Sequence, residues 1–292
     1  MTPASFGLLV LLAALWGASF MFLRLGVPAF GAGWIIELRV GIAFLFLLGV
    51  GRWLGRRIDW RAHWRHYATI GLFNSALPFL LFAYAAGTLP ASVLSVFNST
   101  APIWGALLGL VFLRQPVTAT AGLGLALGVS GVALMTLGEG AHLPVGSSLP
   151  ILAAVLAPLC YAIASGLAQR APQAGGAFEN AAGSMGASSL MVLRFCLAPF
   201  PGQPEAMAWG SALALGILCT GAAYLMYFRL ITDVGPVRAL SVTFLIPLFG
   251  TFWGVVFLNE SLTPRFITGG LLIVVGTILT TGIWRASLRA DH

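Results

Sequence analysis

Long apolar runs, separated by short clusters of glycine, proline and charged residues, fill almost the whole chain. A helix that crosses a membrane needs about 20 mostly apolar residues, and ten runs of about that length lie between the breaks. They are residues 5–24, 33–51, 67–87, 90–113, 118–137, 148–169, 178–198, 206–228, 236–258 and 264–284. The pattern therefore predicts an all-α integral membrane protein with ten transmembrane helices.

Composition and charge support this fold class. The chain has 292 residues, of which 59% are apolar and 8% are charged, and its mean hydropathy is +0.96. A soluble domain carries about 25% charged residues. A soluble enzyme and a nucleic-acid-binding module are therefore excluded, despite the net charge of +7. The partner that this composition indicates is the lipid bilayer.

The basic residues, all arginines, are unevenly placed among the predicted loops. Arg24, Arg194 and Arg265 fall on one side of a ten-helix topology, and Arg39 lies inside the second run. The other eleven share a side with both ends of the chain: Arg52, Arg56, Arg57, Arg61, Arg65, Arg114, Arg170, Arg229, Arg238, Arg285 and Arg289. Because arginine-rich loops stay in the cytoplasm, both termini are predicted to be cytoplasmic. The first run lacks a charged leading segment and is interpreted as a transmembrane helix, not a signal peptide.

The two halves of the chain resemble each other. Residues 102–134 align without a gap with residues 247–279, 145 positions later, and 12 of the 33 aligned residues are identical. We therefore predict two domains, residues 1–140 and 146–292, with five helices each. Because five is odd, the second domain would lie upside down relative to the first. Such inverted repeats let a protein alternate between two related states around a central site.

Three segments carry a resemblance to a known family. They are Leu15-Trp16-Gly17-Ala18-Ser19-Phe20, the stretch from Pro102 and Gly105 to Val111-Phe112-Leu113, and Phe257-Leu258-Asn259-Glu260-Ser261-Leu262-Thr263. With the internal repeat, they make the chain similar to the drug/metabolite transporter superfamily, specifically its ten-helix exporter family built from two EamA-type domains. The resemblance implies a transporter of the bacterial inner (plasma) membrane that works by alternating access. It would export amino acids, aromatic or otherwise amphipathic, and related small metabolites or drugs. We expect no enzymatic activity and no cofactor, and a monomer as the working unit.

The sequence departs from the family pattern in two places. Asn259 stands where the family has glycine before the glutamate, and Gln115 stands where a glutamate would be typical in the first half. The second departure argues against a shared functional role for Glu260. We interpret Glu260 as a helix-end cap at the outer surface.

Polar and aromatic residues at mid-membrane depth form the candidate substrate site. An amide or hydroxyl in hydrocarbon is costly unless it has a partner or faces water, and inverted-repeat transporters bind substrate near the midplane between their repeats. The candidate binding residues are Trp16, Ser19, Asn74, Asn98, Trp104, Tyr161 and Thr243. The two tryptophans could instead pack against neighbouring helices. Because none of these residues carries a full charge, the site is expected to bind weakly.

Four prolines fall near the middle of predicted helices: Pro78, Pro102, Pro158 and Pro247. Each removes one backbone hydrogen bond, which is tolerated in a membrane where the helix lines a cavity or is buried in protein. We interpret them as gating prolines, with ordinary kinked packing as the alternative. Tyr224 and Tyr227 lie nearer the cytoplasmic side and could line a vestibule or belong to an interfacial aromatic belt.

Glu37 is the only acid well inside a run, and it lies about one helical turn deep. Arg24 or Arg39 could neutralise it, so we expect a structural ion pair rather than a proton relay. With no carboxylate at the midplane, transport is expected to run down the gradient of the substrate itself.

Two other function classes are open. A membrane-embedded enzyme acting on lipid or prenyl phosphate would need clustered acids for a metal, or histidine beside a nucleophile. The chain has no such string, its four histidines lie in loops or the tail, and no metal ligands are identified. A non-transporting sensor or assembly subunit would not need an inverted repeat. The three cysteines are interpreted as small buried residues: Cys160, Cys196 and Cys219.

Overall fold

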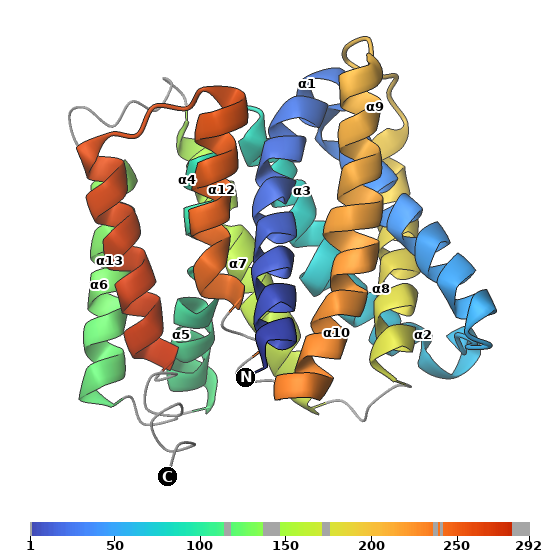
Figure 1. Ribbon diagram of the computed structural model, residues 1–292, viewed down its shortest axis with the longest axis horizontal. Coiled ribbons are helices and arrows are strands. Elements are labelled where there is room, and N and C mark those ends of the chain that lie inside the picture. Colours follow the sequence, from blue (N-terminus) through green and yellow to red (C-terminus); the bar gives the residue numbers. More distant parts are fainter. Residues whose placement is uncertain are drawn as a thin grey trace.

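The computed structural model describes residues 2–113, 118–136, 147–170, 176–235, 239 and 242–281. Within these residues the chain is helical, with short π-helical and 3-10 segments and no strand. Figure 1 shows one bundle of roughly upright helices, with α6 and α13 at one edge and α2 and α8 at the other. The predicted all-α fold class is confirmed for this part of the chain.

The helices follow the predicted runs in order along the chain. In the first half they are α1 (Pro3–Trp53), α2 (Trp60–Gly71), the π-helical segment η1 (Leu72–Ala76), α3 (Leu77–Ala86), α4 (Ala91–Asn98), α5 (Ala101–Leu113) and α6 (Ala119–Thr136). In the second half they are α7 (Ser148–Arg170), α8 (Ala177–Val192), the 3-10 segment η2 (Leu193–Cys196), α9 (Ala206–Leu213), the π-helical segment η3 (Ala214–Ala222), α10 (Ala223–Val234), α12 (Val242–Leu258) and α13 (Pro264–Thr281).

Helix α1 contains the first two predicted runs. Its two parts meet at Gly31, which has φ of 73° and ψ of 166°. A side chain would be strained in that conformation, and glycine has no Cβ to clash. In Figure 1 the first part rises to one end of the bundle and the second part descends from it. The predicted break between these two runs is therefore confirmed.

Five helical stretches are long and apolar enough to cross a membrane: Pro3–Trp53, Trp60–Ala86, Ala91–Val111, Ser148–Ala168 and Ala206–Val234. Three shorter apolar helices accompany them: Ala119–Met135, Val242–Leu258 and Pro264–Thr280. The longest stretch, Pro3–Trp53, contains two of the predicted crossings. Because these stretches are fewer than ten, the number of ten crossings stays a prediction. Large apolar side chains such as Leu45, Leu190 and Leu248 point outward and are 67%, 73% and 65% exposed. Such a surface is suited to lipid rather than water.

The edge helices α6 and α13 pack through glycines in a self-complementary way. A Cβ atom added to Gly124 would lie 2.5 Å from the Gly276 carbonyl oxygen, and one added to Gly131 would lie 2.6 Å from that of Gly269. Gly269 and Gly276 lie 145 positions after Gly124 and Gly131. Gly124 thus contacts the repeat counterpart of Gly131, and Gly131 contacts the repeat counterpart of Gly124. Contacts across a twofold axis have this pattern.

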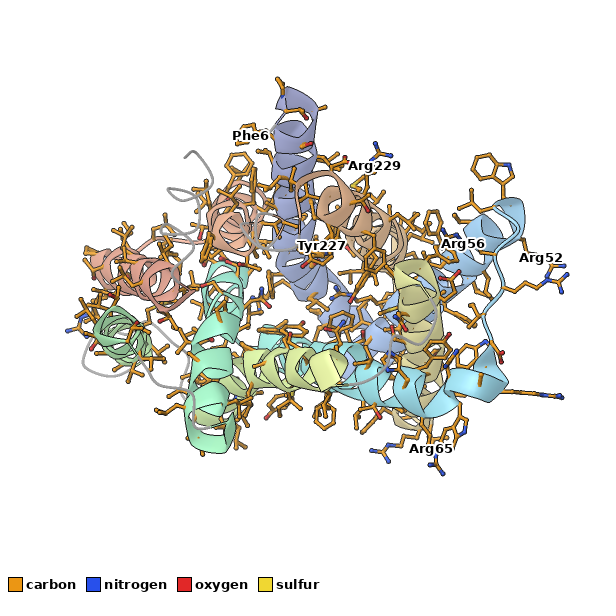
Figure 2. The ribbon with its side chains drawn as sticks, turned by 90° about the horizontal axis from the view of Figure 1, so that it is seen from below. Phe6, Arg52, Arg56, Arg65, Tyr227 and Arg229 are labelled. Atoms are coloured by element: carbon orange, nitrogen blue, oxygen red, sulfur yellow. The ribbon has the colours of Figure 1, made fainter. Side chains whose placement is uncertain are left out.

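The end of the bundle where α1 begins carries outward-pointing arginines. Seen from that end, Arg52, Arg65 and Arg229 project away from the helices, whereas Tyr227 lies among them (Figure 2). Arg56 pairs with Glu179 of α8, with 3.3 Å between Nη1 and Oε1. Among the residues whose exposure the structure describes, one charged residue is an exception to this exposure and is buried in the interior.

Candidate functional site

The exception is Arg39, in the second part of α1. Its side chain is buried, with 6% of the residue exposed. The Nε atom donates a hydrogen bond of 2.9 Å to the Thr220 hydroxyl oxygen. The guanidinium carbon lies 3.7 Å from the centre of the Phe79 ring. Its terminal nitrogens donate no hydrogen bond to any residue that the structure describes, and the ion pairs among those residues do not include Arg39.

Polar and aromatic side chains surround this cation. Tyr161, Tyr224 and Cys219 lie near enough to interact with its charge. The Asn74 side-chain amide donates a 2.8 Å hydrogen bond to the Tyr224 hydroxyl. We call Arg39 and its neighbours Phe79, Tyr161, Cys219, Thr220 and Tyr224 the Arg39 cluster.

Two buried hydroxyls next to the Arg39 cluster lack hydrogen-bond partners among the described residues. They belong to Ser19 and Ser75, which are 4% and 0% exposed. Ser19 lies beside Cys219, and Ser75 lies beside Tyr224. Each hydroxyl therefore lies close to a polar side chain of the cluster and keeps the capacity for a further hydrogen bond.

The two π-helical segments supply much of this site. Asn74 and Ser75 lie in η1, and Cys219 and Thr220 lie in η3. In η1 the Leu77 amide bonds to the Leu72 carbonyl, five residues back. Pro78 has no N–H to offer the preceding turn, which favours this wider winding. Isolated π-helical turns occur frequently at functional sites.

The residues around Arg39 are also repeat counterparts. At the spacing of 145, Asn74 corresponds to Cys219, Ser75 to Thr220, Phe79 to Tyr224 and Trp16 to Tyr161. Arg39 itself corresponds to Ser184 of α8. The two halves therefore contribute equivalent positions to one place, and only the first half contributes the charge.

The backbone repeats the same correspondence. A Cβ atom on Gly71 would lie 2.7 Å from the Ser184 carbonyl oxygen, and one on Gly216 would lie 3.2 Å from that of Arg39. Gly71 and Gly216 are themselves 145 positions apart. The close approach at these glycines brings the π-helical segments against the helices that they face.

Three of the predicted binding residues come together here. Ser19, Asn74 and Tyr161 lie in or beside the Arg39 cluster. Trp16 contacts Tyr227, with 5.3 Å between their ring centres. Asn98 ends α4, Trp104 lies in the first turn of α5, and Thr243 lies in the first turn of α12. A role of these seven residues in substrate binding stays a prediction.

Tyr224 and Tyr227 face the interior of the bundle. Tyr224 bonds to Asn74, and Tyr227 packs against the tryptophan of α1. These contacts favour the predicted vestibule over the aromatic belt.

The sequence analysis missed the central cation. The sequence analysis expects no full charge among the candidate residues, whereas the structure places Arg39 beside several of them. The expected ion pair of Glu37 is also wrong: Glu37 accepts a hydrogen bond from Ser189, and Arg24 donates to the Ala86 carbonyl. The 145-residue spacing could have indicated Thr220 and Tyr224, as counterparts of the polar and aromatic residues in the third run.

The four prolines differ in their settings. Pro158 and Pro247 lie inside α7 and α12, and Pro78 lies in the first turn of α3 where the helix continues from η1. Pro102 differs from the expectation of a position in mid-helix. The chain turns at Ser99 and Thr100, and Pro102 lies in the first turn of α5, where the lack of an N–H costs nothing. Gating by any of these prolines stays a prediction.

Glu260 caps a helix, as the sequence analysis predicts. Its carboxylate accepts hydrogen bonds from the amides of Ala91 and Ser92, at 2.6 and 3.0 Å, and from the Ser92 hydroxyl at 2.6 Å. These groups begin α4, whose N-terminus favours a negative charge. Asn259 has φ of 52°, a left-handed conformation that asparagine tolerates and that suits the glycine of the family pattern. Gly254 leaves the space that the carboxylate fills.

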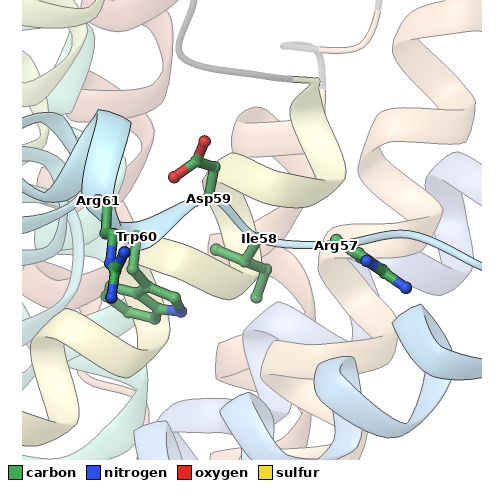
Figure 3. A pocket seen from close by; sticks show the side chains of 5 residues that line it. All are labelled: Arg57, Ile58, Asp59, Trp60 and Arg61. Atoms are coloured by element: carbon green, nitrogen blue, oxygen red, sulfur yellow. The ribbon is translucent and has the colours of Figure 1, made fainter.

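A separate, open depression of about 410 Å³ lies at the loop between α1 and α2, lined by Arg57, Ile58, Asp59, Trp60 and Arg61 (Figure 3). Asp59 accepts a hydrogen bond from the Ala62 amide at the start of α2. This depression belongs to the capped helix start and does not reach the Arg39 cluster residues. Cys160, Cys196 and Cys219 are buried and free. The described residues hold no group of three metal-ligating side chains.

A membrane-type helical bundle whose two related halves meet around a polar site is thus the class that these features define. The sequence pattern of the EamA-like transporter family matches residues 5–137 and 148–282. The chain therefore belongs to the EamA-like transporter family, whose members are membrane proteins.

Individual proteins agree with this assignment. An uncharacterized transporter of Archaeoglobus fulgidus is 24% identical over 274 residues, which cover 92% of this chain and 95% of that protein. A probable terminal-alkyne amino-acid exporter of Streptantibioticus cattleyicolor is 24% identical over 275 residues, which cover 93% of this chain and 91% of that protein. A solved crystal structure has the same fold, with a TM-score of 0.65 at 19% identity, over 98% of this chain and 99% of the other.

Proposed function

We propose that this protein is a secondary transporter that exports amphipathic amino acids and related small metabolites by alternating access. It would cross the membrane ten times, in two inverted five-helix repeats. The observation that carries the proposal is the Arg39 cluster, in which equivalent positions of the two halves surround one buried cation. Transporters built from inverted repeats bind substrate at the repeat interface.

The depth of the cluster supports a site in the middle of the membrane. Arg39 follows the turn at Gly31 by eight residues, which corresponds to about 12 Å along a helix. The hydrocarbon core is about 30 Å thick. Measured from the turn at Gly31, this distance is close to half of that thickness, which supports a position of Arg39 near the midplane.

A difference between the repeats supports alternating access. Gly250 of α12 packs tightly: a Cβ atom there would clash with that of Ser95, and one on Gly17 would lie 2.8 Å from the Gly250 nitrogen. Its repeat counterpart Gly105 has no atom within 4 Å of such a Cβ. The helix is also broken before Pro102 and continuous through Pro247.

We assign the closed end, held by Glu260, to the outside of the membrane. The open end near Gly105 would then face the cytoplasm, and this state would load substrate from inside. The family resemblance, the amino-acid exporter among the relatives and the rings of Trp16 and Tyr161 support an aromatic or otherwise amphipathic amino acid as substrate.

Flux into sealed liposomes tests the proposal. Liposomes that contain the purified protein and unlabelled L-phenylalanine should take up labelled L-phenylalanine faster than protein-free liposomes. If no tested amino acid is taken up faster than by protein-free liposomes, export of this substrate class is refuted.

A pair of glycine variants tests alternating access. Gly105→Leu fits the present structure without a clash, so folding should be normal, but in the opposite state Gly105 would pack as Gly250 does now. Flux should therefore be lost. Gly210→Leu, at another glycine with no atom within 4 Å, is the matched control and should keep its flux. Equal flux in both variants would contradict the two-state scheme.

A further inference from the structure

We infer that Arg39 is the binding group for a carboxylate of the transported molecule, and that the site selects for carboxylates rather than for amines. The role in transport rests on the proposed function, whereas the binding selectivity does not. A carboxylate-bearing, partly aromatic small molecule is the ligand class that this chemistry recognises.

The first argument is that Arg39 has no counter-charge among the residues that the structure describes. An isolated charge in a protein interior within a membrane is costly unless it is paired or hydrated. The acids in the described part of the chain have other roles. Glu37 bonds to Ser189, Asp59 caps α2, Glu179 and Asp233 pair with Arg56 and Arg229, Glu205 is exposed at the start of α9, and Glu260 caps α4. An anion from outside the chain can therefore neutralise Arg39.

The second argument is geometric. Thr220 fixes the Nε atom of Arg39 and the face of Phe79 supports the guanidinium plane. These two contacts orient the side chain and leave its terminal nitrogens available. A guanidinium presents two parallel N–H groups that match the two oxygens of a carboxylate.

The third argument is that the neighbours can complete the shell of donors. The buried hydroxyls of Ser19 and Ser75 lie beside Cys219 and Tyr224 and make no hydrogen bond of standard geometry to the described residues, so each can donate to a ligand. The Tyr224 hydroxyl accepts from Asn74 and so keeps its own proton to donate. The rings of Phe79, Tyr161 and Tyr224 provide an apolar wall for the remainder of the ligand.

Selectivity follows from the charges. Arg39 repels an ammonium group, and none of the described acids belongs to the cluster. The amino group of a zwitterion would have only neutral acceptors, such as the Asn74 amide oxygen. An aromatic carboxylate without an amino group should therefore bind almost as well as the amino acid, and the corresponding amine should bind poorly.

Binding to the purified protein tests the inference directly. The concentration that gives half-maximal thermal stabilisation would be measured for L-phenylalanine, 3-phenylpropionate and 2-phenylethylamine. We expect the first two to agree within a few-fold and the amine to be at least ten-fold weaker. A charge-assisted hydrogen bond corresponds to about ten- to hundred-fold in affinity, so Arg39→Gln should weaken both carboxylates by about that factor and Arg39→Lys by less. Arg24→Gln is the matched control and should change nothing.

The results that would overturn the inference differ from those that would overturn the proposed function. Equal affinity for the amine and the carboxylates in the wild type, or unchanged carboxylate affinity in Arg39→Gln, would overturn the inference. If Arg39→Gln does not fold, the wild-type ligand series and Thr220→Val decide, and this second variant should lose several-fold of carboxylate affinity. Selective binding without flux would refute the proposed function and leave the carboxylate site in place. Flux of the amine equal to that of the amino acid would refute the inference alone.

Discussion

Replacing Glu260 by glutamine should loosen the contact between α12 and the start of α4. The carboxylate accepts three hydrogen bonds there, two from the amides of Ala91 and Ser92 and one from the Ser92 hydroxyl. Glutamine keeps one acceptor oxygen and loses the charge. A hydrogen bond to a charged group contributes about 1.5–3 kcal/mol and a charge at a helix N-terminus about 0.3–1 kcal/mol. The closed arrangement should therefore be destabilised by about 2 kcal/mol relative to the open one, which lowers the ratio of closed to open protein by about 30-fold.

A cysteine behind this cap reports the change. Ser95 is fully buried where α4 packs on Gly250, so Ser95→Cys should react slowly with a bulky maleimide reagent. The three native cysteines, also buried, would be replaced by alanine. Adding Glu260→Gln should raise the labelling rate by about 30-fold if labelling follows the open population.

The matched control is Glu205→Gln, at an exposed carboxylate that begins α9 without a side-chain cap bond. Equal labelling rates in the Glu260→Gln and Glu205→Gln proteins, with both correctly folded, would show that Glu260 does not hold this end of the bundle closed.

Three further predictions follow from the proposed function. Trp104→Ala should reduce L-phenylalanine flux several-fold and spare L-alanine, because one ring contact contributes about 0.5–1.5 kcal/mol; equal losses in competition assays would mean that Trp104 only packs. Glu37→Leu should lower the melting temperature, since it removes the acceptor of the Ser189 bond, and Glu37→Gln should leave the pH dependence of flux unchanged; loss of proton-driven uptake with normal folding would contradict the second expectation. Single cysteines at Ala62 and Gln203 should be labelled from opposite sides of the membrane, and labelling from the same side would refute the predicted topology.

The helices could be predicted because their signals are local. Apolar runs need about 20 residues to cross a bilayer, and glycine or proline clusters interrupt them at the places where the structure turns. The break at Gly31 is one such case, and the turn before Pro90 is another. The start of α2 was placed too late, at residue 67, because the capping bond from Asp59 begins the helix at Trp60 within a polar segment.

The centre of the site could not be derived in the same way. Arg39 and Thr220 are 181 residues apart, and no local pattern shows that an arginine lacks a partner. A π-helical turn has no periodic signature of its own in the sequence. The break at Ser99 and Thr100 does have a local cause, because both hydroxyls bond back to carbonyls three residues earlier, and the repeat counterparts Phe244 and Leu245 have no hydroxyl.

The self-complementary glycine contact between α6 and α13 bears on how the chain assembles during synthesis. Helix α6 is synthesised before α13, so the close contacts of Gly124 and Gly131 with α13 form only after α13 has been made. Closely packed glycine faces are a main source of helix association in membranes. The face of α6 that contains Gly124 and Gly131 is therefore exposed in the bilayer until α13 is inserted. A chain that lacks α13 would keep that face open to lipid or to a second chain, and this edge of the bundle closes only after α13 has been made.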